Sequence, residues 1–307
     1  MKTKAAFFVF LLVILVPSQG LFLSYSPVNM FTTQAKTKQE FPAHPISQEI
    51  RFVEHQNTFS MQKVKKEHYT LRLMVQAKTN MHVDRLQDLT LLFINGTLTD
   101  FFVNNVQKKD TLETTHELGG SQSVKYEVIT YHYAEHNQNG EEVSQNAISY
   151  DQVYLLSSAL STPSLFREPT TNTQKQWQRI LDHAIKQQKK YEQKQLLEKF
   201  KLNEHDYLIY TLDELAVYTN DHLPTFSAHQ TKEVLGQIWK HLYMHYVLGH
   251  VQDKRYPIDT RGSHMPLVAI ARDHSHFHLL FRTRGGDEHK ITQPLMSQLR
   301  THAADIR

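Results

Sequence analysis

Hydrophobic and polar side chains alternate with a period of two along much of the first half of the chain. In residues 71–78, Leu, Leu, Val and Ala alternate with Arg, Met, Gln and Lys, which is the pattern of a half-buried β-strand. Apolar runs on both sides of Asn95-Gly96 predict a hairpin, because both residues accept positive φ angles in a tight turn. Residues 50–165 are therefore predicted to form a mostly antiparallel sheet. The expected strands span 71–78, 89–94, 97–103, 124–134 and 148–157.

The apolar spacing changes to that of amphipathic helices after Pro169. Apolar residues recur at helical intervals in 174–200, and residues 171–173 offer polar side chains for the N-cap. Two shorter helices are expected after capping boxes of the type Ser/Thr-x-x-Glu/Gln. The boxes are Thr211 with Glu214 and Ser227 with Gln230, and the predicted helices span about 174–200, 212–219 and 228–248.

A strand pattern returns near the C-terminus, over residues 266–292, where Gly285-Gly286 predicts a turn. Residues 170–307 are therefore predicted to form an α+β region. The predicted fold class is α+β, with an N-terminal mostly antiparallel β-sheet region, a helical middle and a C-terminal β-hairpin element. A length of 307 residues fits one or two domains.

The first 25 residues have the features of a secretory segment. Two lysines precede residues 5–16, an apolar run that is shorter than the roughly 20 residues of a membrane span but typical of a signal-peptide core. The small residues Ser18 and Gly20 favour cleavage after residue 20, whereas the apolar character up to residue 25 favours a single membrane anchor. Either outcome places the body outside the cytoplasm. Residues 26–49 are predicted to be a flexible linker.

The amino-acid composition limits which compartments and which kinds of chemistry are expected. The chain has no cysteine, which excludes disulfides, thiolate nucleophiles and cysteine-ligated metals, and is unusual for an exported eukaryotic protein of this size. We therefore expect a bacterial cell-envelope protein, for which nucleic acid is not an expected partner. The chain also has 20 histidines, so mild acid is expected to add positive charge.

Basic side chains outnumber acidic ones along the helix predicted over 174–200. Together with the His- and Arg-rich strand near the C-terminus, this helix is predicted to form a surface that binds an anionic wall or membrane polymer, or a protein partner. The residues assigned to this surface are Arg272, Arg282, Arg284, Lys186, Lys189 and Lys190.

His274, His276 and His278 alternate along one predicted strand and are the candidate metal ligands. Alternate strand residues share a face and lie about 6.6 Å apart, so their imidazoles can converge on a zinc ion. The residue order differs from the H-x-H-x-D-H of metallo-β-lactamase-type sites. Residues 272–275 also fit a turn, which would split this face.

No chemical role is assigned to the remaining sequence patterns. His241 and His245 lie four residues apart on a predicted helix, but Leu242 stands where a zinc protease needs its glutamate, so a structural role is expected. No nucleotide-binding loop or serine-hydrolase elbow is present, and no catalytic or cofactor-binding residue is assigned.

The sequence therefore predicts an exported, envelope-associated, non-enzymatic protein that contacts the membrane through its N-terminal segment. The alternative hypothesis is a metal-dependent hydrolase that binds zinc through the three alternating histidines.

Overall fold

The described part of the protein is mostly β: strands hold 52% and helices 23% of the described residues. The computed structural model describes residues 40–66, 68–158, 161–251 and 255–295, so the predicted signal or anchor segment and most of the predicted linker lie outside the described residues. The predicted α+β class with a helical middle is wrong. The reasons are the length of the N-terminal strands and an extra strand within the helical part.

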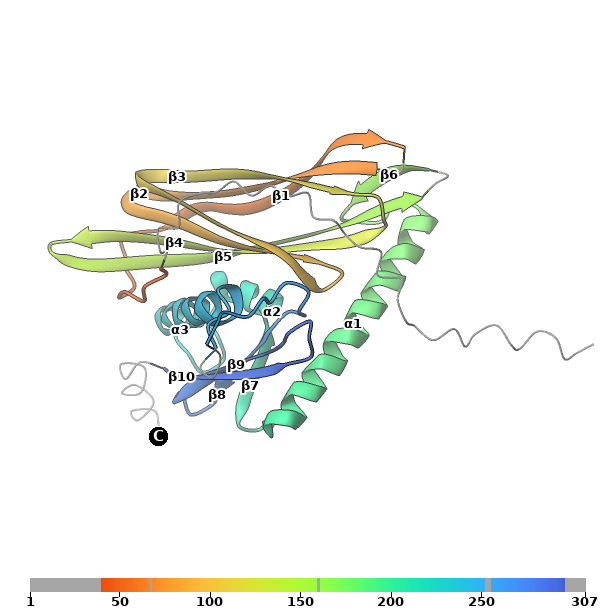
Figure 1. Cartoon of the computed structure of the whole chain (residues 1–307). Helices are drawn as coiled ribbons and strands as arrows, with labels where there is room; N and C mark the ends of the chain where they lie inside the picture. Colours follow the sequence, from red (N-terminus) through yellow and green to blue (C-terminus); the bar gives the residue numbers. More distant parts are fainter. Residues whose placement is uncertain (1–39, 67, 159–160, 252–254, 296–307) are drawn as a thin grey trace, which may run out of the picture. The chain divides into compact units, whose positions relative to one another are not determined.

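The N-terminal half forms one antiparallel, nearly closed barrel-like sheet (Figure 1). Its hydrogen-bonded order is β1-β2-β4-β5-β6, and β3 pairs with β2. The φ angles of Asn95 and Gly96 are 52° and 77°, which confirms the predicted turn between β2 and β3. The strands are β1 (Phe52–Lys65), β2 (His68–Ile94), β3 (Thr97–Gly120), β4 (Val124–Gln138), β5 (Glu141–Ser158) and β6 (Ser161–Phe166).

The C-terminal half holds a second, four-stranded antiparallel sheet of order β10-β9-β8-β7. Strand β7 interrupts the helical middle and pairs with β8, so the predicted C-terminal hairpin is one part of a larger sheet. The strands are β7 (Tyr207–Thr211), β8 (Leu267–Ala271), β9 (His276–Arg282) and β10 (Glu288–Pro294). The α-helices in the described part are α1 (Asn172–Phe200), α2 (Leu212–Ala216) and α3 (Ala228–His241), and a π-helix (Leu242–Val247) continues α3.

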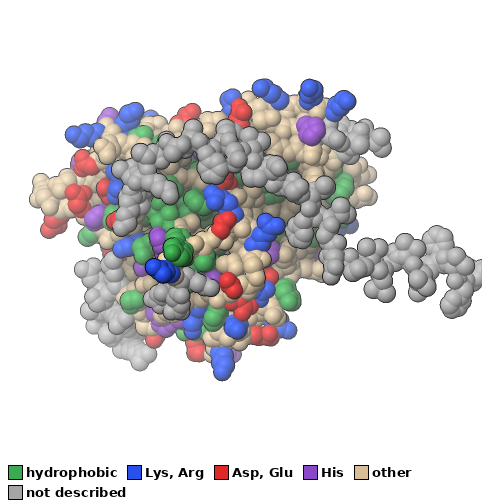
Figure 2. All heavy atoms as spheres, in the orientation of Figure 1, with side chains coloured by type: hydrophobic (Ala, Val, Ile, Leu, Met, Phe, Trp, Pro, Cys, Tyr) green, Lys and Arg blue, Asp and Glu red, His purple; other side chains and the backbone are tan. Residues whose placement is uncertain are grey.

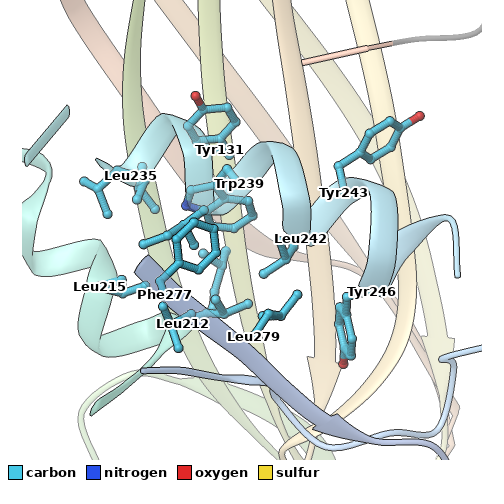
Figure 3. Close-up of a cluster of buried hydrophobic side chains, with 14 of the residues drawn as sticks. Tyr131, Leu212, Leu215, Leu235, Trp239, Leu242, Tyr243, Tyr246, Phe277 and Leu279 are labelled. Atoms are coloured by element: carbon cyan, nitrogen blue, oxygen red, sulfur yellow. The ribbon is translucent and has the colours of Figure 1, made fainter. Parts of the chain in front are cut away.

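Helix α3 packs between the two sheets in the largest hydrophobic core of the described residues (Figure 3). Trp239 is fully buried and stacks on Tyr131 of β4, with ring centroids 5.2 Å apart. Phe277 and Leu279 of β9 belong to the same core. One face of the large sheet and one face of the small sheet are therefore both buried, which leaves the other face of β9 for its histidines.

The packed body begins before residue 50. Phe41 is buried and its ring contacts those of Tyr131, Tyr133 and Tyr243, and Ile46 forms a parallel bridge with Ser144. The sequence predicts residues 40–49 to be part of a flexible linker, but in the structure they belong to the folded body. Within the described residues, no helix combines the length and apolar character that membrane crossing requires.

Candidate functional site

Two of the three predicted histidines converge on a tyrosine, on the face of the small sheet opposite to Phe277 and Leu279. The Nε2 atoms of His276 and His278 lie 3.2 Å apart. The Tyr207 hydroxyl oxygen lies 3.2 Å from each of these nitrogen atoms. The three atoms therefore form a triangle with equal sides, and we call these three residues the His-Tyr triangle.

Strand pairing brings the His-Tyr triangle together. His276 and His278 are alternate residues of β9 and share a face. Tyr207 lies on β7, two strands away, and the two residues between them are small: Ala271 is paired with Tyr207 and Ala269 with His278. A larger side chain at either alanine would separate the tyrosine from the imidazoles.

The other ring nitrogen of each histidine has its own hydrogen-bond partner. The Ser275 hydroxyl donates to the carboxylate of Asp273 at 2.6 Å, so its oxygen accepts from Nδ1 of His276, also at 2.6 Å. The Nδ1 atom of His278 lies 2.9 Å from the Thr292 hydroxyl. Partners of this kind hold metal-binding imidazoles in place and fix which nitrogen faces the metal.

His274 does not join the triangle. It lies in the turn between β8 and β9 with a φ of 59°, its Nε2 atom lies 2.8 Å from the Thr225 hydroxyl, and its ring stacks on Phe226. In the described part of the chain, no three His, Cys, Asp or Glu side chains are arranged to hold a metal ion. The expected three-histidine set is therefore not formed, and two of these histidines lie beside a tyrosine instead.

Burial sets the electrostatics of the triangle. It lowers the pKa of His278 to about 4, with a further contribution from the neighbouring His276. Burial also raises the pKa of Tyr207 above its usual value. Hydrogen bonds from Ser275 lower the pKa of Asp273, so this carboxylate is ionised at neutral pH.

The size of the triangle matches the edge of a metal coordination shell. In a tetrahedral site with metal–nitrogen distances of about 2.0–2.1 Å, two ligand atoms lie about 3.3 Å apart. The 3.2 Å sides agree with this edge. Two imidazoles and a phenolate suit a first-row transition metal.

The six residues of the predicted basic surface lie in different environments. Arg282 bonds to Glu192 and Glu288, and Lys189 bonds to Asp213. Arg272 donates to a backbone carbonyl, and the side chain of Arg284 packs near Gly262. These four cations therefore do not act as one positive patch. Figure 2 likewise shows basic and acidic side chains interspersed on the visible face.

Lys186 and Lys190 line a groove beside α1, with a volume of about 900 Å³. Within the described residues, neither lysine forms an ion pair with an acidic side chain. Lys125 and Lys189 also line the groove. Their Nζ atoms lie 3.1 and 3.8 Å from Oε1 of the buried Glu127. Lys186 and Lys190 thus lack an acidic partner among the described residues, in a groove that six lysines and five acidic residues line.

His241 and His245 lie on α3 and its π-helical continuation, with parallel rings whose centroids are 5.7 Å apart. The His241 ring contacts Phe277 of the core, and Nδ1 of His245 bonds to the His250 carbonyl oxygen. Burial lowers the pKa of His241 to about 4. Both imidazole rings therefore make contacts with other parts of the folded chain.

Comparisons with known proteins give no functional guide. No protein family model matches the chain, and no curated protein matches its sequence. Among solved structures, it is similar to a glycosyl hydrolase family 2 member from Bacteroides cellulosilyticus DSM 14838, with a TM-score of 0.24 and 11% identity. The match covers 38% of this chain and 17% of that protein, and a likeness of this size carries no argument.

Proposed function

We propose that this protein binds a divalent first-row transition metal, such as zinc or copper, through the His-Tyr triangle. The observation that carries the proposal is the set of three 3.2 Å distances among His276, His278 and Tyr207. Because Ser275 accepts from Nδ1 of His276, the Nε2 atom of that ring presents a lone pair to the centre of the triangle.

The geometry supports binding more than hydrolysis. A metal-dependent hydrolase needs a general base within hydrogen-bond reach of the metal-bound water. Among the described residues, no carboxylate contacts the three triangle atoms, and Asp273 reaches His276 only through Ser275. We therefore propose that the His-Tyr triangle binds a metal ion without catalysing hydrolysis.

Calorimetric titration of untagged, chelator-treated protein with zinc and copper ions tests the proposal. We expect one saturable site that is lost in the double variant His276→Ala/His278→Ala. His274→Ala is the matched control, because His274 lies in the same segment but bonds to Thr225. Equal loss in the control, or unchanged binding in the double variant, would refute the His-Tyr triangle.

A second proposed function is the binding of an anionic polymer in the groove beside α1. Lys186 and Lys190 support it, because they line the groove without an ion pair to any described acid. We expect Lys186→Gln/Lys190→Gln to weaken binding of a polyglycerol phosphate and to reduce its salt dependence. The control Lys175→Gln/Arg179→Gln alters the same helix outside the groove, and an equal loss there would argue against the groove.

Export remains part of the proposal, on the strength of the lysine-led apolar segment at residues 5–16. Cell fractionation of the full-length chain tests it, together with a variant in which this segment is interrupted by two arginines. Cytoplasmic recovery of the unaltered full-length chain would exclude an envelope role.

A further inference from the structure

A hydrogen-bonded chain of Asp88, His132 and Ser149 crosses three neighbouring strands of the large sheet. Nδ1 of His132 lies 2.8 Å from the Asp88 carboxylate, and Nε2 lies 2.8 Å from the Ser149 hydroxyl. Asp88 and His132 are fully buried, and Ser149 is 7% exposed. A nucleophile, a base and a group that orients the base are held in this same order in serine hydrolases of unrelated folds.

The strand register produces this arrangement. Asp88 of β2 is paired with His132 of β4, and Ser149 of β5 is paired with Thr130, two residues from His132 on the same face. Thr130 is bonded to Thr90 and Asn57, so a layer of polar side chains surrounds the histidine. Along the strands, two separate clusters of apolar side chains lie on either side of this polar layer.

Ser149 is one of the residues that line a pocket of about 310 Å³. The pocket lies where β1 and β5 approach without being neighbours in the hydrogen-bonded order. Asn57 of β1 bridges this seam by donating to the Ser149 carbonyl oxygen at 3.1 Å. The lining also includes Asn57, Asp151 and Arg167.

We propose that Ser149 is a nucleophile that accepts the acyl group of a small carboxylic ester, with His132 as the general base. The Ser149 oxygen bonds to the carbonyl carbon while its proton moves to Nε2 of His132. The bond to the leaving alcohol then breaks, and the alcohol takes that proton. Water attacks the acyl-serine through the same base, which releases the acid and restores Ser149. Asp88 is a positioning residue, because it holds the imidazole through Nδ1.

The size and polarity of the pocket define the substrate class. A volume of about 310 Å³ lies at the lower end of the range for small-molecule sites, so short acyl groups fit and long chains do not. Arg167 and Asp151 form a two-contact ion pair at the pocket, which adds a polar wall. Neutral short-chain esters are therefore the expected ligands.

Covalent labelling with a fluorophosphonate probe tests the proposal on the full chain. Ser149 displaces fluoride from phosphorus, and mass spectrometry locates the modified residue. We expect labelling to be lost in Ser149→Ala and His132→Gln, and kept in Ser157→Ala, which alters another serine of β5. The metal-site variant His276→Ala/His278→Ala is also expected to label normally, so the two proposals fail independently.

A cysteine at the same position gives a second test that does not depend on the probe. Because the chain has no cysteine, Ser149→Cys introduces a single thiol, and Ser157→Cys, at a more exposed position of the same strand, is the control. A thiol activated by His132 should react with iodoacetamide at pH 7 about 10-fold faster than the control, and His132→Gln should remove that difference. Equal rates, or an unreactive cysteine in a protein that melts normally, would overturn the assignment.

Discussion

At the scale of single residues, the Tyr207 hydroxyl is the part of the proposed metal site that the sequence did not predict. Replacing Tyr207 by Phe removes one oxygen and keeps the ring. We expect zinc affinity to fall by at least about 10- to 100-fold, the loss that follows removal of an outer-shell partner, because this change removes a proposed ligand atom. Competition with a chromogenic chelator measures this loss. A phenolate ligand should also give the copper-loaded protein a visible absorption band that disappears in Tyr207→Phe.

Ala271→Val is the companion change, because Ala271 is paired with Tyr207 and keeps the path to the histidines open. It should reduce metal affinity without touching a ligand atom. Unaltered affinity in both variants would leave a site made by the histidines alone. The sequence identified His276 and His278 from their alternate spacing, but Tyr207 lies 69 and 71 residues away from them. Only strand pairing brings it close.

At the scale of elements, α3 is held to the large sheet by Trp239 (Figure 3). Its ring is fully buried and stacks on Tyr131, so Trp239→Ala should lower the free energy of unfolding by about 3–5 kcal/mol. Trp239→Phe should cost much less, because it keeps an aromatic ring and removes an indole N–H that has no partner in the described part. Urea unfolding measures both. Equal losses would mean that stacking contributes little.

Elements differed in how well the sequence predicted them. The helices carry local signals: Ser227 and Gln230 form both halves of a capping box, and α3 begins where that box places it. The long strands carry such signals over only part of their length. Strand β2 spans 27 residues, and residues 89–93 are buried on both faces, which erases alternation. Strand β7 has five residues between helices, and its place in a sheet depends on β8.

At the scale of the whole molecule, some histidines are buried and differ from the acid-charged surface that the sequence suggested. Burial lowers the pKa of both His55 and His241 from 6.5 to about 4. These rings therefore stay neutral in the folded protein at pH 6, and they add no charge to a polymer-binding surface. The count of 20 histidines could not reveal this, because burial is a property of the tertiary fold.

The lowered pKa values instead predict a fold that is sensitive to acid. In the unfolded chain, His55 and His241 take up protons near their ordinary pKa of 6.5, whereas in the folded chain they do so only near 4. Between these values the unfolded state binds more protons, so stability is complete above pH 6.5 and falls as the pH drops towards 4. The urea midpoint should therefore be lower at pH 5 than at pH 7. His241→Gln should shrink this difference, whereas the exposed His222→Gln should keep it. A midpoint that does not change with pH would show that these imidazoles titrate alike in both states.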